Sequence, residues 1–107
     1  MGIEMLKKIN LVHAVNHIPE LFQYLEIGRL NNHMLNVLQA KNRTLDFHVH
    51  TGSDELFYVI EGSVEVELDD GIIPLAQGDL LIIPKGTRHR PICTSLVKCL
   101  LLPPEVS

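Results

Sequence analysis

The sequence has 107 residues, 46% of them apolar, and a net charge of −4, which fits one globular domain with a modest core. Its lysines and arginines are scattered singly or in pairs, whereas a nucleic-acid surface needs a basic stripe, so we expect no nucleic-acid partner. No apolar run approaches the roughly 20 residues of a membrane span, and the N-terminal residues lack the apolar stretch of a signal peptide. We therefore expect a cytoplasmic protein without a membrane partner.

The N-terminal third of the chain gives weak signals. Residues 17–26 carry apolar side chains at positions 18, 21, 22 and 25, with Pro19 near the start, and this spacing predicts a short helix. Residues 33–41 have the composition of a strand. We expect the part before residue 33 to form a short N-terminal extension.

From residue 45 onward the chain consists of short apolar or alternating runs separated by turn residues. Such runs predict strands at 45–50, 55–62, 63–71, 72–79, 80–86, 89–93 and 95–104. Turn-forming residues recur at 51–53, 69–71, 77–79 and 84–86. Short strands at this spacing predict an all-β fold, an antiparallel sandwich or barrel. No linker, repeat or low-complexity tract interrupts the pattern, so we expect residues 1–107 to form a single domain.

Residues 56–60 and 80–83 are apolar at both odd and even positions. A strand with one face in water alternates apolar and polar residues, so both faces of these two strands need cover. Either the N-terminal segment or a second subunit can supply it. Because the chain is short, we expect a homodimer.

The segment around residues 47–62 places three metal-binding side chains close together. His48 and His50 are two residues apart and share one face of an extended chain. Glu55 follows after four residues, and Gly62 after six more. Taken alone, the two histidines could equally be solvent-facing residues of an edge strand, and Glu55 an ordinary surface residue at the start of a strand.

A second pattern lies about thirty residues further along the chain. Gly78 is followed after five residues by Pro84, then by Gly86 and, two residues later, by His89. Pro84 and Gly86 predict a turn that leads His89 into the next strand. By itself His89 could be a turn residue without a function.

Together the two patterns match the pair of motifs that define the cupin superfamily, which this chain resembles over about residues 33–102. The resemblance implies a single antiparallel jelly-roll barrel, a double-stranded β-helix, with one metal ion held by His48, His50, Glu55 and His89. More narrowly, the chain is similar to small single-domain cupins of the mannose-6-phosphate-isomerase-like, or cupin type-2 barrel, group. Two positions depart from the full pattern: Asn42 replaces a glycine, and Cys93 replaces an asparagine, which puts any role of that amide in doubt.

The chemistry of the four side chains supports the same conclusion. Three imidazole nitrogens and one carboxylate oxygen suit a divalent transition-metal ion, Zn, Mn, Fe, Ni, Co or Cu, and are too rich in nitrogen for Ca or Mg. Such an ion polarises a carbonyl, ionises a bound water or binds dioxygen. The ligands do not determine which of these ions is used.

Other residues have two interpretations each. His13, His17 and His33 are solvated or packed rather than ligands. Arg88 and Arg90 flank His89 and bind an anionic substrate at the mouth of the barrel, or else are solvated charges at a strand end.

Phe57 and Val59 share the parity of Glu55 and are expected to line the cavity. Cys93 shares the parity of His89, so it either lies behind the ligands or belongs to the core. Cys93 and Cys99 have neither a metal-site nor a disulfide spacing, and we expect free thiols.

Three functions fit these residues. The first is a metalloenzyme that acts on a small polar metabolite as an isomerase, lyase or dioxygenase, although the sequence shows no separate general base. The second is a metal-dependent module that binds or senses a small molecule without turnover, and the third is a metal site that is chiefly structural. The chain shows no DNA-binding domain to which a sensor would be attached, so the first function is favoured.

Overall fold

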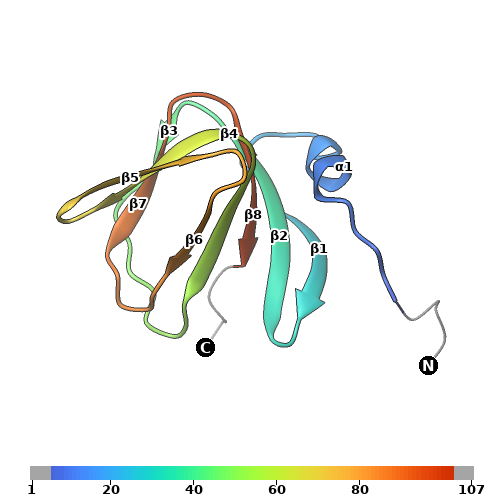
Figure 1. Cartoon of the computed structure of the whole chain (residues 1–107), viewed down its shortest axis with the longest axis horizontal. Helices are drawn as coiled ribbons and strands as arrows, with labels where there is room; N and C mark the ends of the chain where they lie inside the picture. Colours follow the sequence, from blue (N-terminus) through green and yellow to red (C-terminus); the bar gives the residue numbers. More distant parts are fainter. Residues whose placement is uncertain (1–5, 103–107) are drawn as a thin grey trace.

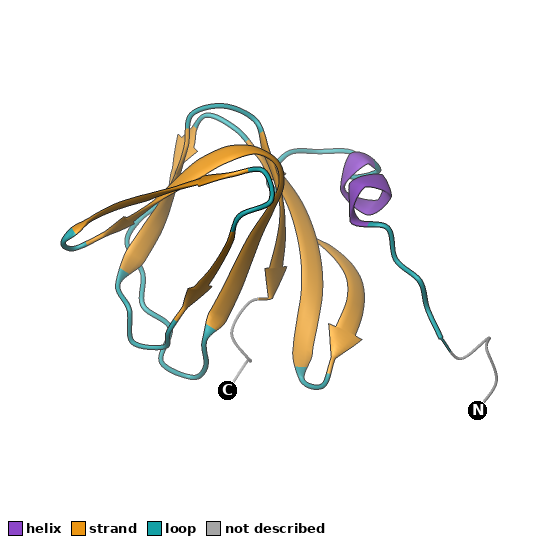
Figure 2. Cartoon of the chain, viewed as in Figure 1, coloured by secondary structure: helices purple, strands orange, loops and turns teal. Residues whose placement is uncertain are grey.

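The computed structural model describes residues 6–102, which form one short helix and eight strands. The helix is α1 (Leu11–Asn16), and the strands are β1 (Leu25–Leu30), β2 (His33–Ala40), β3 (Arg43–Thr44), β4 (Glu55–Leu68), β5 (Gly71–Ala76), β6 (Leu80–Ile83), β7 (His89–Cys93) and β8 (Val97–Leu102). All the strand pairs are antiparallel. The prediction of an all-β antiparallel fold with a short N-terminal extension is confirmed (Figures 1 and 2).

Strand β4 connects the two sheets of the barrel. Its first half pairs with β6 and β8, and its second half pairs with β5 and β7. The strand changes partners at Gly62, where its pairing with β8 ends and its pairing with β5 begins. The φ of Gly62 is +87°, and an added Cβ would lie 2.3 Å from the carbonyl oxygen of Leu96. Only glycine fits this backbone without displacing its neighbour. The motif glycine therefore allows one strand to contribute to both sheets (Figure 1).

Residues 6–102 form two apolar clusters, one inside the barrel and one on its outer face. The inner cluster includes Val59, Val64, Val66 and Val97. The outer cluster joins α1 to the outward side chains of β2, β4 and β8, and its members are Val15, Ile18, Ile27, Val37 and Ile60, with Leu11, Ala14, Leu35, Tyr58 and Leu100 packed against them. The N-terminal segment thus covers part of the second apolar face of β4.

The outward side chains of β6 have no such cover. Leu80 and Ile82 are 53% and 55% exposed, while Leu81 and Ile83 pack into the barrel. The N-terminal segment therefore covers part of the outer face of β4, one of the two strands that are apolar on both faces. The outer face of β6 is uncovered, and the homodimer that we expect to cover it stays a prediction.

The prediction of a helix at residues 17–26 is wrong. The chain forms a turn there, and β1 begins at Leu25. The N–H of Phe22 donates to the carbonyl of Gln39 on β2 at 2.7 Å, and Leu25 pairs with Val37. Pairing with β2 therefore outweighs a weak helical spacing. The helix that does form, α1, follows Asn10, whose side chain accepts a bond from a backbone N–H of the first turn.

The prediction of a strand at residues 45–50 is also wrong. This segment runs beside β7 but does not form a regular ladder with it. Only an isolated bridge forms, in which His48 and His89 exchange backbone bonds of 2.9 and 3.0 Å. The opposing strand contains Pro91, which has no N–H to donate and so interrupts the ladder. The N–H of Leu45 still donates to the carbonyl of Pro91 at 3.2 Å.

The strand predicted at residues 33–41 is confirmed as β2, and the four predicted turns separate strands as expected. Asn42 has a φ of +52°, so asparagine supports the left-handed turn where the family pattern has glycine. Among the described residues, no helix is long and apolar enough to cross a membrane.

Candidate metal centre

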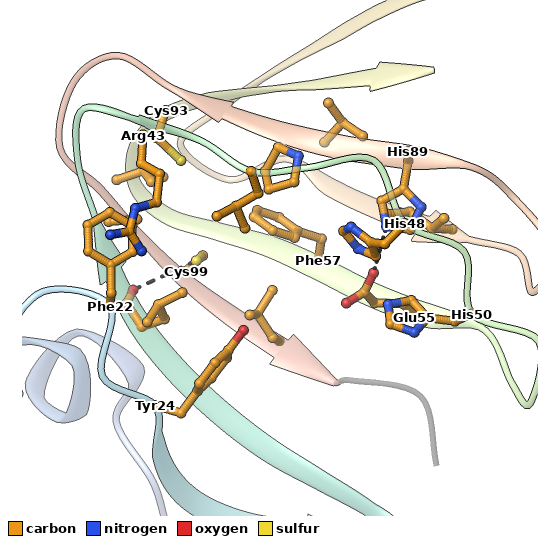
Figure 3. A pocket seen from close by; sticks show the side chains of 18 residues that line it. Phe22, Tyr24, Arg43, His48, His50, Glu55, Phe57, His89, Cys93 and Cys99 are labelled. Carbon is orange, nitrogen blue, oxygen red and sulfur yellow. Dashed lines mark hydrogen bonds and ion pairs between the residues drawn. The ribbon is translucent and has the colours of Figure 1, made fainter. Parts of the chain in front are cut away.

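The four predicted ligands lie together at one end of the barrel. Glu55 begins β4 and His89 begins β7, whereas His48 and His50 lie in the segment before β4. One ligand atom from each residue lies within 4.8 Å of those of the others. Figure 3 shows the imidazoles and the carboxylate pointing toward a common centre. The structure therefore brings together all four residues that the two motifs single out.

Backbone carbonyls fix the orientation of two of the imidazoles. Nδ1 of His48 lies 3.1 Å from the carbonyl oxygen of Asp46, and Nδ1 of His89 lies 2.9 Å from that of Thr87. A carbonyl oxygen only accepts, so we assign the proton to Nδ1 in both rings. In the neutral ring this leaves the Nε2 lone pair free, which is the form that binds a metal.

The contact between His89 and Glu55 is favourable only if a positive charge lies between them. Nε2 of His89 lies 3.1 Å from Oε1 of Glu55, and the two side chains are only 3% and 14% exposed. With Nδ1 already protonated, a neutral His89 would direct its lone pair at a carboxylate oxygen, so two acceptors would face each other. A proton on Nε2 or a metal ion between the two residues removes this repulsion. The three nitrogens and one carboxylate oxygen fit a divalent transition-metal ion.

Two hydrogen bonds join the loops that carry the ligands. The N–H of Lys85 donates to Oδ1 of Asp54 at 2.9 Å, and the N–H of Gly86 donates to the carbonyl of His50 at 2.6 Å. The turn before His89 is thereby fixed against the segment that holds the other ligands. Asp54, the carboxylate next to Glu55, thus has a structural role, and only Glu55 belongs to the cluster.

The remaining histidines lie outside the cluster. His13 and His17 are exposed, and their rings lie 4.1 Å apart at α1. His33 is partly buried at the start of β2. None of the three belongs to the metal-binding group found among residues 6–102, in agreement with the interpretation that they are solvated or packed.

The cluster forms one end of a cavity of about 250 Å³ inside the barrel. Its wall is mostly apolar and includes Leu38, Val66 and Ile83. Phe57 lines the cavity, as its parity with Glu55 predicted. Val59, predicted in the same way, is instead completely buried in the core and does not line it. A volume of this size suits a small molecule.

Both cysteines line the cavity as free thiols, as predicted. Burial raises the pKa of Cys93, and burial together with nearby Cys93 raises the pKa of Cys99 to about 12. The Cys99 thiol donates to the carbonyl of Leu38 at 3.7 Å. Because both thiols stay protonated at neutral pH, they are weak nucleophiles and act as small apolar wall residues.

Tyr24 is a residue of the site that the sequence did not reveal. Its hydroxyl points into the cavity (Figure 3). Tyr24 as a whole is 59% exposed, but partial burial, followed by the negative charge of Glu55, raises its pKa, so the phenol is protonated at neutral pH and serves as a hydrogen-bond donor. The sequence missed it because the residue falls in the segment wrongly predicted to be helical.

Arg88 and Arg90 do not line the cavity. Arg88 pairs with Asp69, and Arg90 donates to Glu67 at 2.7 Å, while both guanidinium groups lie over the ring of Phe47. Of the two interpretations, the one that makes both arginines charges at a strand end is correct, although each of them pairs with a carboxylate rather than with water alone. The arginine that does line the cavity is Arg43, a residue that the sequence patterns did not single out.

An antiparallel barrel with three imidazoles and a carboxylate at one end of its cavity is a candidate metal-binding β-barrel. Residues 35–103 match the family described as Cupin domain. The chain therefore belongs to the cupin family, as the two motifs predicted, and its barrel is the cupin jelly roll.

Three relatives illustrate the match. The chain is 37% identical to the uncharacterized protein YdbB of Bacillus subtilis over 80% of this chain and 76% of that protein. It is 34% identical to the polyketide synthase CurC of Streptomyces cyaneus over 60% of this chain and 42% of that protein. A crystal structure of a cupin-2 domain containing protein from Shewanella frigidimarina superposes with a TM-score of 0.86 and 25% identity, covering 97% of this chain and all of the other.

Proposed function

We propose that this cupin binds one divalent transition-metal ion through His48, His50, Glu55 and His89 and acts as a metalloenzyme on a small molecule in the cavity. The observation that carries the proposal is the contact of His89 with Glu55 at 3.1 Å, in a cluster whose ligand atoms all lie within 4.8 Å. When bound there, such an ion supplies a Lewis acid, an ionised water or an oxygen-binding centre.

The side chains around the cluster determine what the substrate looks like. The apolar part of the wall packs against the body of the substrate, and a polar end faces the four clustered residues. The Tyr24 hydroxyl donates a hydrogen bond to an oxygen at that end. The substrate is therefore less polar than the sequence alone predicted. The name of the CurC relative agrees with this description, since polyketides are carbon skeletons that carry carbonyl and hydroxyl oxygens.

A ligand screen with the metal-loaded protein tests this function. Compounds with an apolar body and an oxygen-bearing end are expected to raise the melting temperature in the presence of the metal and not after chelation. Conversion of the hit to a product shows an enzyme. Oxygen consumption during turnover then indicates a dioxygenase, and its absence indicates an isomerase or lyase. Equal shifts with and without metal would contradict the proposal.

One observation favours an alternative, a metal-dependent binding or sensing module without turnover. Apart from the four clustered residues, the part of the cavity wall formed by residues 6–102 contains no carboxylate or imidazole. The raised pKa values of Tyr24 and Cys93 keep both protonated at neutral pH, so neither is available as a general base. Saturable binding with no product after long incubation would support this alternative.

A further inference from the structure

The end of the cavity opposite the metal cluster is lined by a positively charged side chain. Arg43, on β3, and Phe22 both line the cavity, and the guanidinium carbon of Arg43 lies 4.1 Å from the centroid of the Phe22 ring. Figure 3 shows this stacked pair on one side of the cavity and His48, His50 and Glu55 on the other, with Phe57 between them.

Arg43 differs from the other arginines in its charge balance. Arg29, Arg88 and Arg90 each form an ion pair with a carboxylate. No carboxylate within the described range, residues 6–102, pairs with Arg43, and Arg43 is the arginine that faces the cavity. A guanidinium stays charged at every physiological pH, so the exposed edge of the cavity carries a permanent positive charge that has no counter-ion among residues 6–102.

The stacking leaves the hydrogen-bonding edge of this guanidinium available. An arginine stacked on an aromatic ring still presents N–H donors in its own plane, in the fork that matches a carboxylate. Arg43 is itself exposed to solvent, which weakens its general attraction for anions, so its selectivity for a carboxylate rests on the geometry of this fork.

The backbone under the stacked ring is strained. Phe22 has a φ of +60°, which is uncommon and unfavourable for a bulky residue. The bond from its N–H to the carbonyl of Gln39, at 2.7 Å, holds it there. This strain sets the ring at the edge of the cavity beneath Arg43, and residues held in this way are concentrated at ligand sites.

We propose that Arg43 determines specificity by binding a carboxylate at the far end of the ligand. The proposal rests on the proposed function, because it takes the metal cluster as the site of the other end. The ligand is then an elongated acid with a metal-coordinating oxygen group at one end, an apolar middle that packs on Phe57, and a carboxylate that meets Arg43.

The first experiment uses the chelator-stripped protein, so that a carboxylate cannot bind through a metal. Octanoate and octanamide are titrated into the wild type, Arg43→Met and Arg88→Met by calorimetry. Without metal, the contact of His89 in the cluster is already taken by the carboxylate of Glu55, so Arg43 is the expected partner. A charge-assisted bond predicts that octanoate binds about tenfold or more tightly than octanamide. We expect this ratio in the wild type and Arg88→Met, and a ratio near one in Arg43→Met. The same ratio in Arg43→Met and the wild type, or a ratio near one in the wild type, overturns the proposal.

The second experiment uses the metal-loaded protein and monohydroxamates of dicarboxylic acids of increasing length, each paired with its terminal carboxamide. We expect one chain length at which the carboxylate form binds about tenfold or more tightly in the wild type, and Arg43→Met should remove that preference. Arg43→Lys should retain part of it, because the charge remains. Equal binding of both forms at every length overturns the role of Arg43 and leaves the metal site intact. Loss of hydroxamate binding with no metal uptake overturns the proposed function, while the metal-free titration still decides the role of Arg43.

Discussion

Replacing His50 by alanine should abolish metal-dependent stabilisation while leaving the fold intact. His50 is only partly buried, and its side chain makes no hydrogen bond with the residues of the described range. His89, by contrast, is 3% exposed and contacts both Thr87 and Glu55, so its removal would also leave buried polar groups without partners. His50 is therefore the ligand whose loss disturbs the metal site with the least effect on the apo-protein.

The expected magnitude follows from linkage between metal binding and folding. An ion that binds only the folded state stabilises it by about 2.7 kcal/mol at a hundredfold excess over its dissociation constant. A domain of this length shifts its melting temperature by about 4–8 °C per kcal/mol, so the wild type should gain about 10–20 °C. With one of four ligands removed, the same ion concentration should give His50→Ala only a small fraction of that gain.

The assay is a melting curve of chelator-stripped protein, re-exposed in turn to Mn, Fe, Co, Ni and Zn, with elemental analysis of the loaded samples. His13→Ala is the matched control, because His13 is an exposed histidine outside the cluster. Affinity should fall when the pH is lowered enough to protonate the imidazoles, since only neutral rings bind. If no ion shifts the wild-type curve, the cluster is not a metal site. Equal uptake by His13→Ala and His50→Ala would show that the wrong histidines were chosen.

Three further predictions concern the fold. Gly62→Ala should cost more than about 2 kcal/mol of unfolding free energy in a denaturant titration, because its Cβ would lie 2.3 Å from a carbonyl oxygen; Gly78→Ala, with a φ of +88° but open space, is the control and should cost less. Cys99, whose pKa rises from 9.0 to about 12 on folding, stabilises the protein fully below pH 9 and loses this contribution as the pH rises toward 12. From pH 8 to pH 10 the wild type should lose about 1 kcal/mol more than Cys99→Ala, and equal losses would contradict this reasoning. The protein should be a homodimer by light scattering, and Leu80→Glu with Ile82→Glu should make it monomeric; a monomeric wild type at micromolar concentration refutes the prediction.

The barrel and the cluster could be predicted because their signals are local. The spacing of His48, His50 and Glu55 requires only a short extended segment, and the Pro84–Gly86 turn requires only its own residues to adopt its shape. The same holds for Asn42, where a tolerance of positive φ is a property of the residue itself. Alternation along the strand also predicted correctly that Phe57 lines the cavity. The same argument was wrong for Val59, because parity gives the face of a strand and not the depth of a side chain in the barrel.

The predictions that failed depended on pairing between distant segments. Residues 17–26 have a helical spacing, yet β2 offers Phe22 and Leu25 backbone partners that a helix would forgo. The segment before Glu55 has the composition of a strand, yet a proline on the opposing strand removes the donor that a regular ladder needs. In both segments the secondary structure depends on a pairing partner more than ten residues away in the sequence. Local propensity contains no information about such a partner.

This division between local and distant signals also separates the candidate metal site from the proposed ligand site. The four clustered residues come from the two motifs, which any cupin with the same spacing shares. Tyr24, Phe22 and Arg43 come from outside both motifs, from a turn and a two-residue strand whose positions depend on pairing with β2 and β7. Cupins that match this chain only in the motifs are therefore expected to share its metal chemistry but not its ligand, and a search for the substrate should be guided by the residues that surround the far end of the cavity.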